Sequence, residues 1–258
     1  MTERGYPRYL EEGFEPYDPV ELIRRTETIV SRGTSRKYTS FYCTGVYGGI
    51  STGYTVGCCL RCAFCWVDWS RDFPEKYGQF YTPEGVFQHL VANARKKRVA
   101  KLRISGGEPT LVRAHLLSLL DLVEATDYLF ILETNGLPLA ADETYARELA
   151  QYSRIHVRVS LKAGSAQGFQ ARTGAQGQFW ELPFLAIQRL MEAGVSFHVA
   201  AMSDPRLMPP AERREMIRRL RGIGYRDYLE EERCDPYPTS VARLGAAGFR
   251  IFEEGDGS

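Results

Sequence analysis

The segment Gly57-Cys58-Cys59-Leu60-Arg61-Cys62-Ala63-Phe64-Cys65 holds four of the six cysteines of this 258-residue chain within eight residues. Cys58, Cys62 and Cys65 have the spacing C-x3-C-x2-C. Starting from Cys59 instead, the spacing is C-x2-C-x2-C, which occurs in the cysteine runs of ferredoxins. A disulfide framework does not easily explain cysteines packed this closely, so the segment indicates metal binding or catalysis.

The number of thiolates restricts the kind of metal site. A fully ligated [4Fe–4S] cluster takes four thiolates, but Cys234 lies 169 residues beyond Cys65 and is not an obvious fourth ligand. A tetrahedral zinc site also needs a fourth ligand, and the histidine nearest to the cysteines is His89. Three thiolates around four irons would leave one iron open to a substrate or cofactor, as a catalytic metal site requires.

Outward from this segment, strand-like and helix-like stretches alternate. The expected strands are Ile50–Val56, Ala100–Ser105, Tyr128–Glu133, Ile155–Leu161, Val195–Met202 and Arg226–Glu231. The expected helices are Thr82–Lys96, Leu111–Glu124, Asp142–Gln151, Leu182–Ala193 and Pro210–Arg221. Strict alternation predicts parallel strands joined by crossover helices. We therefore expect an α/β fold, a partial (β/α)6 TIM-like barrel with parallel strands, and keep an open doubly wound sheet as the alternative.

One face of two expected strands is polar. Every second side chain is polar from His156 to Lys162 in the fourth strand, and from Lys101 to Ser105 in the second. Parallel strands covered on both faces are usually apolar, so the polar face predicts a barrel interior that holds a ligand; the alternative is a solvent-exposed sheet face. The candidate substrate pocket consists of Arg103, His156 and Arg158 on these faces, together with His198 on the fifth expected strand.

A pocket of this composition is expected to be cationic and to suit a carboxylate or a phosphate. The alternative is that the same side chains close the floor of the barrel through internal hydrogen bonds.

Charge and hydropathy exclude several classes of protein. The net charge is +1, from 33 basic and 32 acidic residues, which argues against nucleic-acid binding through bulk charge. No apolar stretch is long enough to cross a bilayer, and the N-terminus lacks the apolar core of a signal peptide. We therefore expect a cytoplasmic protein without a membrane partner, in which thiols stay reduced.

The chain is expected to divide into three parts. Residues 1–42 form an N-terminal extension with one helix, which begins at Asp18-Pro19 because aspartate caps helices and proline favours the first helical position. Residues 43–234 form the barrel domain, and residues 235–258 form a C-terminal tail.

Further motifs stand at the ends of expected strands. Ser105-Gly106-Gly107-Glu108-Pro109 follows the second strand, Glu133-Thr134-Asn135-Gly136 the third, and Ser160-Leu161-Lys162 the fourth. Together with the C-x3-C-x2-C spacing and the aromatic Phe64, they make residues 48–231 resemble the radical S-adenosylmethionine (SAM) enzymes. The likeness is strongest to small single-cluster members such as pyruvate formate-lyase activating enzyme, with some likeness to carboxy-deazaguanine synthases.

This resemblance implies specific roles. Cys58, Cys62 and Cys65 would bind a [4Fe–4S] cluster whose open iron takes the amino and carboxylate groups of SAM. The SAM-binding residues would be Phe64, Gly106, Gly107, Glu108, Pro109, Glu133, Ser160 and Lys162. Within that set Glu108 would accept a hydrogen bond from the SAM ammonium, Glu133 would bind the ribose hydroxyls, and Lys162 would face the methionine carboxylate of SAM. Cys43, Cys59 and Cys234 are expected to be structural thiols.

The resemblance also implies a reaction. The cluster, reduced by a partner such as a ferredoxin or flavodoxin, would cleave SAM into methionine and a 5′-deoxyadenosyl radical, which abstracts hydrogen from a substrate. That substrate would be a small anionic metabolite or a peptide or protein, as in glycyl-radical activation. Glu133 and Ser160 depart from that activase pattern, which tends to have aspartates there. Two alternatives are an iron–sulfur electron carrier that never cleaves SAM, and a metal-stabilised binding module, for RNA through the arginine-rich helix at 210–221.

Overall fold

The computed structural model describes residues 5–252. Its strands are β1 (Ser31–Arg32), β2 (Ser35–Thr44), β3 (Ile50–Thr55), β4 (Gln79–Tyr81), β5 (Lys101–Gly106), β6 (Leu129–Thr134), β7 (Ile155–Leu161), β8 (Phe197–Met202) and β9 (Leu229–Glu232). Its helices are α1 (Pro19–Val30), α2 (Pro83–Lys97), α3 (Arg113–Glu124), α4 (Leu137–Ala141), α5 (Tyr145–Leu149), α6 (Ala166–Thr173), α7 (Leu182–Ala193), α8 (Pro210–Gly222) and α9 (Pro238–Ala246), with 3-10 turns η1 (Val46–Gly48) and η2 (Gly177–Glu181).

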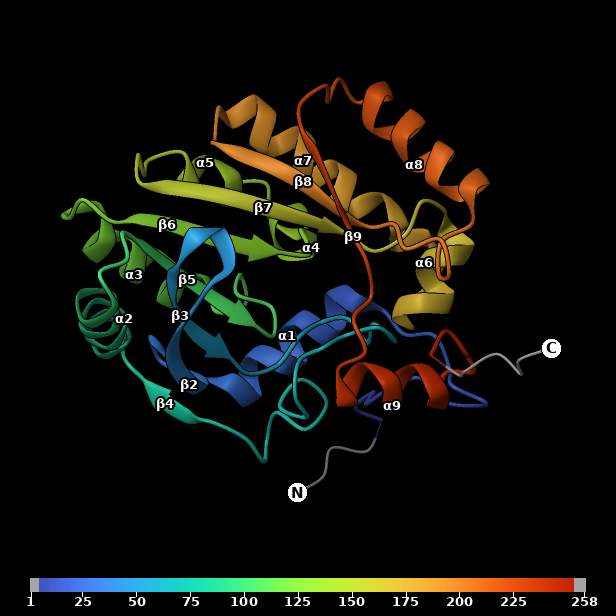
Figure 1. The fold of residues 1–258 in the computed structure, drawn as a ribbon, viewed down its shortest axis with the longest axis horizontal. Helices are drawn as coiled ribbons and strands as arrows, with labels where there is room; N and C mark the ends of the chain where they lie inside the picture. Colours follow the sequence, from blue (N-terminus) through green and yellow to red (C-terminus); the bar gives the residue numbers. More distant parts are fainter. Residues whose placement is uncertain (1–4, 253–258) are drawn as a thin grey trace.

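Six parallel strands form an incompletely closed barrel. Within the described residues, one sheet has the order β1-β2-β3-β5-β6-β7-β8-β9, with β4 paired to β2. Neighbouring strands along this order from β3 to β9 are parallel, and in residues 5–252 β9 does not pair back to β1 or β2. Figure 1 shows the strands fanned around a central space, with α2, α3, α7 and α8 on the outer side. The predicted α/β fold with a partial (β/α)6 barrel is confirmed.

The alternation of polar and apolar side chains has a direct structural cause. Leu102, Ile104, Val157 and Val159 are fully buried against the outer helices. Their polar neighbours in β5 and β7 point to the opposite, inner face, where Arg103 and Ser105 donate to Glu133 on β6 and Arg158 donates to Glu230 on β9. Burying the aliphatic side chains stabilises the fold by roughly 2 kcal/mol each, and this outer core holds the inner polar face in register.

The N-terminal region contributes more than the predicted helix. The helix is present as α1, and the Asp18 carboxylate accepts from Val20 N at 2.7 Å and Glu21 N at 3.2 Å. The sequence analysis missed β2, which pairs antiparallel with β3 and so belongs to the sheet. The expected boundary between residues 42 and 43 therefore falls inside a strand. The tail from residue 235 contains the helix α9, also missed.

A buried histidine joins the N-terminal strand to the barrel. His115 is fully buried on α3, with Nε2 2.8 Å from Tyr38 Oη and Nδ1 2.7 Å from Thr34 O. Burial lowers the pKa of His115 to about 4. Between this value and the ordinary histidine pKa of about 6.5, the unfolded chain binds a proton that the native protein does not.

We expect His115 to make folding sensitive to acid. Because the unfolded state binds more protons, the contribution of His115 to stability is complete above about pH 6.5 and decreases by roughly 3 kcal/mol towards pH 4. Urea unfolding of the wild type and of His115→Gln at a series of pH values measures this dependence. The variant should lose that part of the slope; identical slopes in both proteins would show that His115 does not titrate in this way.

Candidate functional site

Two loops at the carboxyl ends of β3 and β5 dock backbone to backbone. Glu108 N donates to Gly57 O at 2.8 Å, and Gly107 N donates to Thr55 O at 2.9 Å. A Cβ on Gly107 would lie 2.0 Å from Gly57 O, so any larger residue would force the two loops apart. Gly106 has φ +96°, a backbone conformation that glycine adopts without strain. The Gly-Gly-Glu motif thus packs directly against the start of the cysteine segment.

The four clustered cysteines differ in exposure and in acidity. Cys58 and Cys65 are half-buried, Cys62 is buried, and Cys59 is fully buried. Asn135 Nδ2 donates to Cys59 Sγ at 3.4 Å and lies 3.7 Å from Cys58 Sγ. A hydrogen bond from the Cys59 thiol lowers the pKa of Cys58 to about 7, whereas burial raises the pKa of Cys59. Cys58 is therefore the more accessible and more acidic thiol of the adjacent pair.

The donor set suits a multi-iron cluster better than a single ion. In residues 5–252 no three His, Cys, Asp or Glu side chains gather closely enough to hold one metal ion. Tetrahedral zinc needs its ligands that close. The thiolates of a four-iron cluster bind different irons, so their sulfurs stand farther apart. Cys58, Cys62 and Cys65, on one loop, provide three soft sulfur donors of the type such clusters take.

Glu108 connects several backbone and side-chain groups at this end of the sheet through hydrogen bonds. It is 2% exposed, and its carboxylate accepts from Thr110 N at 3.1 Å, Thr110 Oγ1 at 2.6 Å, Thr134 Oγ1 at 2.7 Å and Asn135 N at 2.8 Å. These bonds tie the loop after β5 to the end of β6. Substituting Glu108 would leave several buried donors unpaired, so loss of ligand binding in Glu108→Ala would not by itself identify a ligand contact.

Glu133 lies on the inner face of the barrel at the end of β6. Its Oε1 accepts from Tyr47 Oη at 2.8 Å and from Arg103 Nη1 at 2.9 Å, and its Oε2 accepts from Ser105 Oγ at 2.7 Å. Burial alone would raise the pKa of Glu133. The positive charges of Arg103 and Arg158 and these hydrogen bonds outweigh burial, so the pKa lies below its ordinary range. Glu133 is therefore a carboxylate oriented by its neighbours.

Lys162 and Phe64 approach each other near the cysteine segment. Lys162 Nζ donates to Ser160 Oγ at 2.8 Å and lies 6.0 Å from the centre of the Phe64 ring. Pro109 contributes a backbone oxygen to a different contact, accepting from Arg36 Nη1 at 2.6 Å. Of the predicted SAM-binding residues, Lys162, Ser160 and Phe64 therefore come together, and Pro109 faces a buried arginine.

The four side chains of the predicted substrate pocket all make contacts on the inner face. Arg158 Nε donates to Glu230 Oε2 at 2.8 Å, and its Nη2 lies 2.7 Å from Glu232 Oε1. His198 Nε2 lies 3.0 Å from Glu230 Oε2 and its Nδ1 lies 2.8 Å from His156 Nε2. Internal hydrogen bonds of the kind that would close the floor of the barrel are thus present between these side chains.

These contacts change the charge expected for the pocket. Arg103 is paired with Glu133, and Arg158 with Glu230 and Glu232, so the arginine charges are balanced by carboxylates. The two arginines of the predicted pocket therefore do not present unpaired positive charge to a ligand. The sequence analysis did not consider Glu230 and Glu232, although their acidic run at 230–232 was visible, because the last expected strand gave no reason to assign either of them to the inner face.

Exposed aromatic side chains border the cysteine segment. The rings of Tyr42 and Tyr54 stack at 4.5 Å, Trp66 lies edge-on to Tyr54 at 6.2 Å, and Tyr237 lies 6.4 Å from Trp66. Tyr42, Trp66 and Tyr237 are 49%, 44% and 50% exposed. We call these four residues the aromatic rim. Tyr54 shares a strand face with Thr52, which accepts from Arg103 at 3.1 Å, so the rim continues into the barrel interior.

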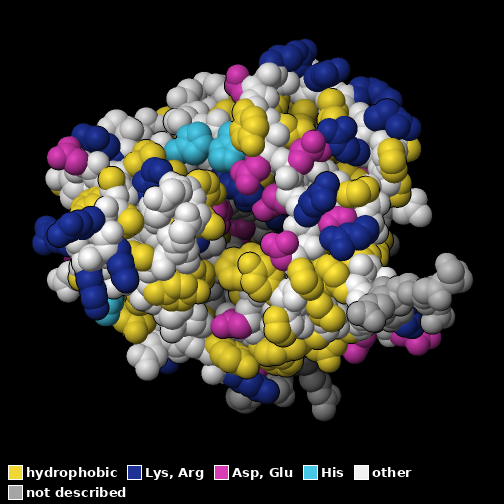
Figure 2. Space-filling view, in the orientation of Figure 1, with side chains coloured by type: hydrophobic (Ala, Val, Ile, Leu, Met, Phe, Trp, Pro, Cys, Tyr) yellow, Lys and Arg dark blue, Asp and Glu magenta, His cyan; other side chains and the backbone are white. Residues whose placement is uncertain are grey.

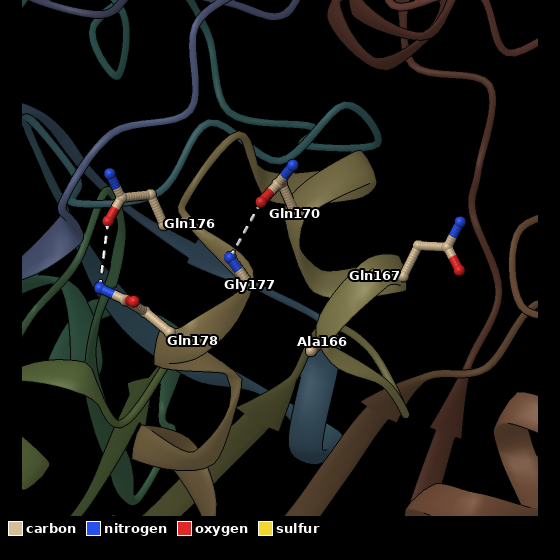
Figure 3. A pocket seen from close by; sticks show the side chains of 6 residues that line it. All are labelled: Ala166, Gln167, Gln170, Gln176, Gly177 and Gln178. Atoms are coloured by element: carbon tan, nitrogen blue, oxygen red, sulfur yellow. Dashed lines mark hydrogen bonds between the residues drawn. The ribbon is translucent and has the colours of Figure 1, made fainter.

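The open side of the barrel is hollowed. Figure 2 shows a recess near the centre of this face, with histidine, acidic and basic side chains above it and hydrophobic side chains below it. A separate depression of about 560 Å³ lies on the outside, over α6 and η2 (Figure 3). It is lined by Ala166, Gln167, Gln170, Gln176, Gly177 and Gln178. With no ionisable side chain in its lining, that depression offers no group for acid–base or metal chemistry.

The remaining two cysteines make local contacts. Cys43 is half-buried, with Sγ 3.5 Å from Asn93 O. Cys234 is buried near Phe64, and burial raises the pKa of its thiol to about 11. Among the described residues, no helix combines the length and the apolar character that crossing a membrane requires.

Comparisons with solved structures agree with this architecture. SuiB from Streptococcus suis bound to its precursor peptide SuiA matches with a TM-score of 0.58 and 16% identity, over 77% of this chain and 40% of that protein. anSMEcpe with bound SAM matches with a TM-score of 0.51 and 16% identity, over 73% of this chain and 56% of that one. A radical SAM methyltransferase from Sphaerobacter thermophilus matches with a TM-score of 0.51 and 15% identity, over 78% and 63%.

The chain thus spans less than two thirds of the length of each of these proteins. No curated protein sequence matches it. The family model of the radical SAM superfamily matches residues 53–220, which is more than half of the chain and includes the cysteine segment and every strand-end motif. This protein therefore belongs to the radical SAM superfamily, whose cofactors are a [4Fe–4S] cluster and SAM.

Proposed function

We propose that this enzyme cleaves SAM reductively and uses the resulting 5′-deoxyadenosyl radical to abstract hydrogen from a peptide or protein segment. When bound, the cluster supplies one electron, from a reductant such as a ferredoxin or flavodoxin, to break the C–S bond of SAM. The observation that carries the proposal is the docking of the Gly-Gly-Glu loop on the cysteine segment, with Glu108 N bonded to Gly57 O at 2.8 Å.

Cys58, Cys62 and Cys65 are the proposed cluster ligands. Cys58 is preferred to Cys59 because it is half-buried and its pKa is lowered, whereas Cys59 is fully buried and its pKa is raised. A thiol that ionises near neutral pH binds iron with a smaller proton cost. This assignment keeps the spacing C-x3-C-x2-C.

Side chains at the strand ends are the proposed SAM site. Lys162 offers an ammonium to the methionine carboxylate, and Ser160 holds that ammonium at 2.8 Å. Glu133, fixed by Arg103 and Ser105, retains lone pairs for the ribose hydroxyls. The other members of the site are Phe64, Gly106, Gly107, Glu108 and Pro109. Because Glu108 already accepts four hydrogen bonds, we assign it mainly to holding this loop in place.

The barrel interior and its rim support a peptide or protein substrate. The arginines there are balanced by carboxylates, so a small anion would have to displace Glu230 from Arg158. Three rings of the aromatic rim, those of Tyr42, Trp66 and Tyr237, are instead exposed beside the cysteine segment, and such rings are enriched where proteins bind other chains. A small anionic metabolite remains the second candidate, favoured by the convergence of Arg103, Arg158 and His198 on the interior.

Deuterium transfer tests the class of substrate. An extract of cells grown in D₂O is separated by ultrafiltration into small molecules and macromolecules, and each fraction is added to reduced enzyme with unlabelled SAM. Hydrogen abstraction from the substrate then places deuterium in 5′-deoxyadenosine, which mass spectrometry detects. We expect label from the macromolecular fraction. Label only from the small-molecule fraction would support the metabolite instead.

A further inference from the structure

Three buried arginines each hold the backbone of one proposed cluster ligand. In each case the arginine Nη1 donates a hydrogen bond to the cysteine carbonyl oxygen. The three bonds join Arg61 to Cys58 O at 2.7 Å, Arg71 to Cys62 O at 2.7 Å, and Arg243 to Cys65 O at 2.6 Å. We call these residues the arginine triad. They come from the cysteine segment itself, from the loop that follows it, and from α9 in the C-terminal tail. Each cysteine of the C-x3-C-x2-C pattern has its own guanidinium.

The triad carries more positive charge than its protein partners neutralise. Arg61, Arg71 and Arg243 are 0%, 1% and 1% exposed. Asp72 bonds to both Arg71 and Arg243. Among residues 5–252 Arg61 is bonded to no carboxylate, and it lies over the Tyr6 ring at 5.1 Å. Three guanidinium charges and one carboxylate leave two positive charges in a buried region.

Uncompensated charge in a protein interior is costly, so this excess requires an explanation. Burial and the neighbouring Arg71 lower the pKa of Arg243, whereas nearby groups that carry negative charge when ionised, Asp72 among them, raise the pKa of Arg61 and of Arg71. In the described residues, Arg61 Nη2 and Arg243 Nε are buried without a hydrogen-bond acceptor. Removing charges from water carries a large penalty unless opposite charge is close by. The ionised sulfurs of Cys62 and Cys65 raise the pKa of Arg71, and that of Cys65 raises the pKa of Arg243, so thiolates of the residues whose carbonyls the triad binds can supply negative charge to it.

We propose that the arginine triad sets the reduction potential of the cluster by stabilising its reduced form. Gaining one electron from the external reductant adds one negative charge to a centre already ligated by three thiolates, and nearby buried positive charge favours that state. Salt screens such buried interactions weakly. The inference rests on the proposed ligands Cys58, Cys62 and Cys65. It gives α9 a function, because Arg243 connects that helix to the redox centre.

The test is a redox titration of the reconstituted holoprotein, followed by electron paramagnetic resonance of the reduced cluster. Arg243→Gln removes one positive charge, so the midpoint potential should become more negative. Asp72→Asn removes the sole carboxylate of the group, so the potential should become more positive. We expect each change to alter the oxidised-to-reduced ratio about tenfold, which is about 59 mV for one electron. Arg243→Lys retains the charge and should stay close to the wild type.

The opposite signs distinguish an electrostatic role from a structural one. Both substitutions disturb the same buried hydrogen bonds, so damage to the loop alone would shift both potentials in the same direction and would overturn the proposal. Arg218→Gln, on the exposed face of α8, is the matched control and should leave the potential unchanged. If Arg243→Gln fails to retain a cluster, the other two variants still test the proposal. The midpoint potential should become more positive in Asp72→Asn and stay close to the wild-type value in Arg243→Lys. A wild-type protein without any cluster would instead refute the proposed ligands.

Discussion

Replacing Gly107 by alanine is expected to reduce SAM cleavage at least roughly 100-fold. The new Cβ would lie 2.0 Å from Gly57 O, far inside van der Waals contact, so the Gly-Gly-Glu loop must move away from the cysteine segment. Displacing a reacting group by about 1 Å commonly costs a factor of 100 in rate. The measurement is 5′-deoxyadenosine formation by the reconstituted variant, together with its affinity for SAM by equilibrium dialysis.

Gly222→Ala is the matched control for this substitution. Gly222 ends α8 with open space where a Cβ would be added, so that variant should bind and cleave SAM as the wild type does. If Gly107→Ala retains wild-type SAM affinity and cleavage, the two loops are not the SAM-binding surface we infer.

Cys58→Ala is expected to abolish the cluster, whereas Cys59→Ala is expected to retain it. Cys58 is half-buried and the pKa of its thiol is lowered to about 7, and Cys59 is fully buried in the apolar region around Leu60 and Leu137. Loss of one of three thiolate ligands leaves two irons of a four-iron cluster without protein ligands. Iron and sulfide content after anaerobic reconstitution, and the visible absorbance of the cluster, measure the outcome.

The paired variants also test the spacing of the motif. A cluster that survives Cys58→Ala but not Cys59→Ala would assign the ferredoxin-like spacing C-x2-C-x2-C to this protein. Loss of the cluster in both variants, with the fold intact by circular dichroism, would mean that the Cys59–Asn135 hydrogen bond at 3.4 Å is needed to shape the loop.

The parallel strands could be predicted because each combines a short apolar run with a defined end. The expected bounds of β7, Ile155–Leu161, coincide with those of the structure. Its alternation also identified the inner polar face, since one set of side chains is buried against helices and the other contacts neighbouring strands. The strand-end motifs follow from the same regularity, because parallel strands bring their carboxyl ends to one edge of the sheet.

The missed features depend on contacts that leave no local pattern. The strand β2 reads Ser-Arg-Lys-Tyr-Thr-Ser-Phe-Tyr-Cys-Thr, in which polar and aromatic residues do not alternate, and pairing with β3 makes it a strand. The balance of Arg158 by Glu230 joins strands 72 residues apart, and Arg243 reaches Cys65 across 178 residues. Spacing within a segment cannot reveal such partners, so the charge of the interior and the arginine triad required the structure.

The measurement that tests the central claim most directly is formation of 5′-deoxyadenosine by anaerobically reconstituted protein given dithionite and SAM. We expect the wild type to produce 5′-deoxyadenosine and methionine, and Cys62→Ala, which lacks one proposed cluster ligand, to produce neither. SAM binding, measured on the same samples by equilibrium dialysis, accompanies the assay. An intact, reducible cluster in a protein that neither binds SAM nor forms 5′-deoxyadenosine would contradict the claim.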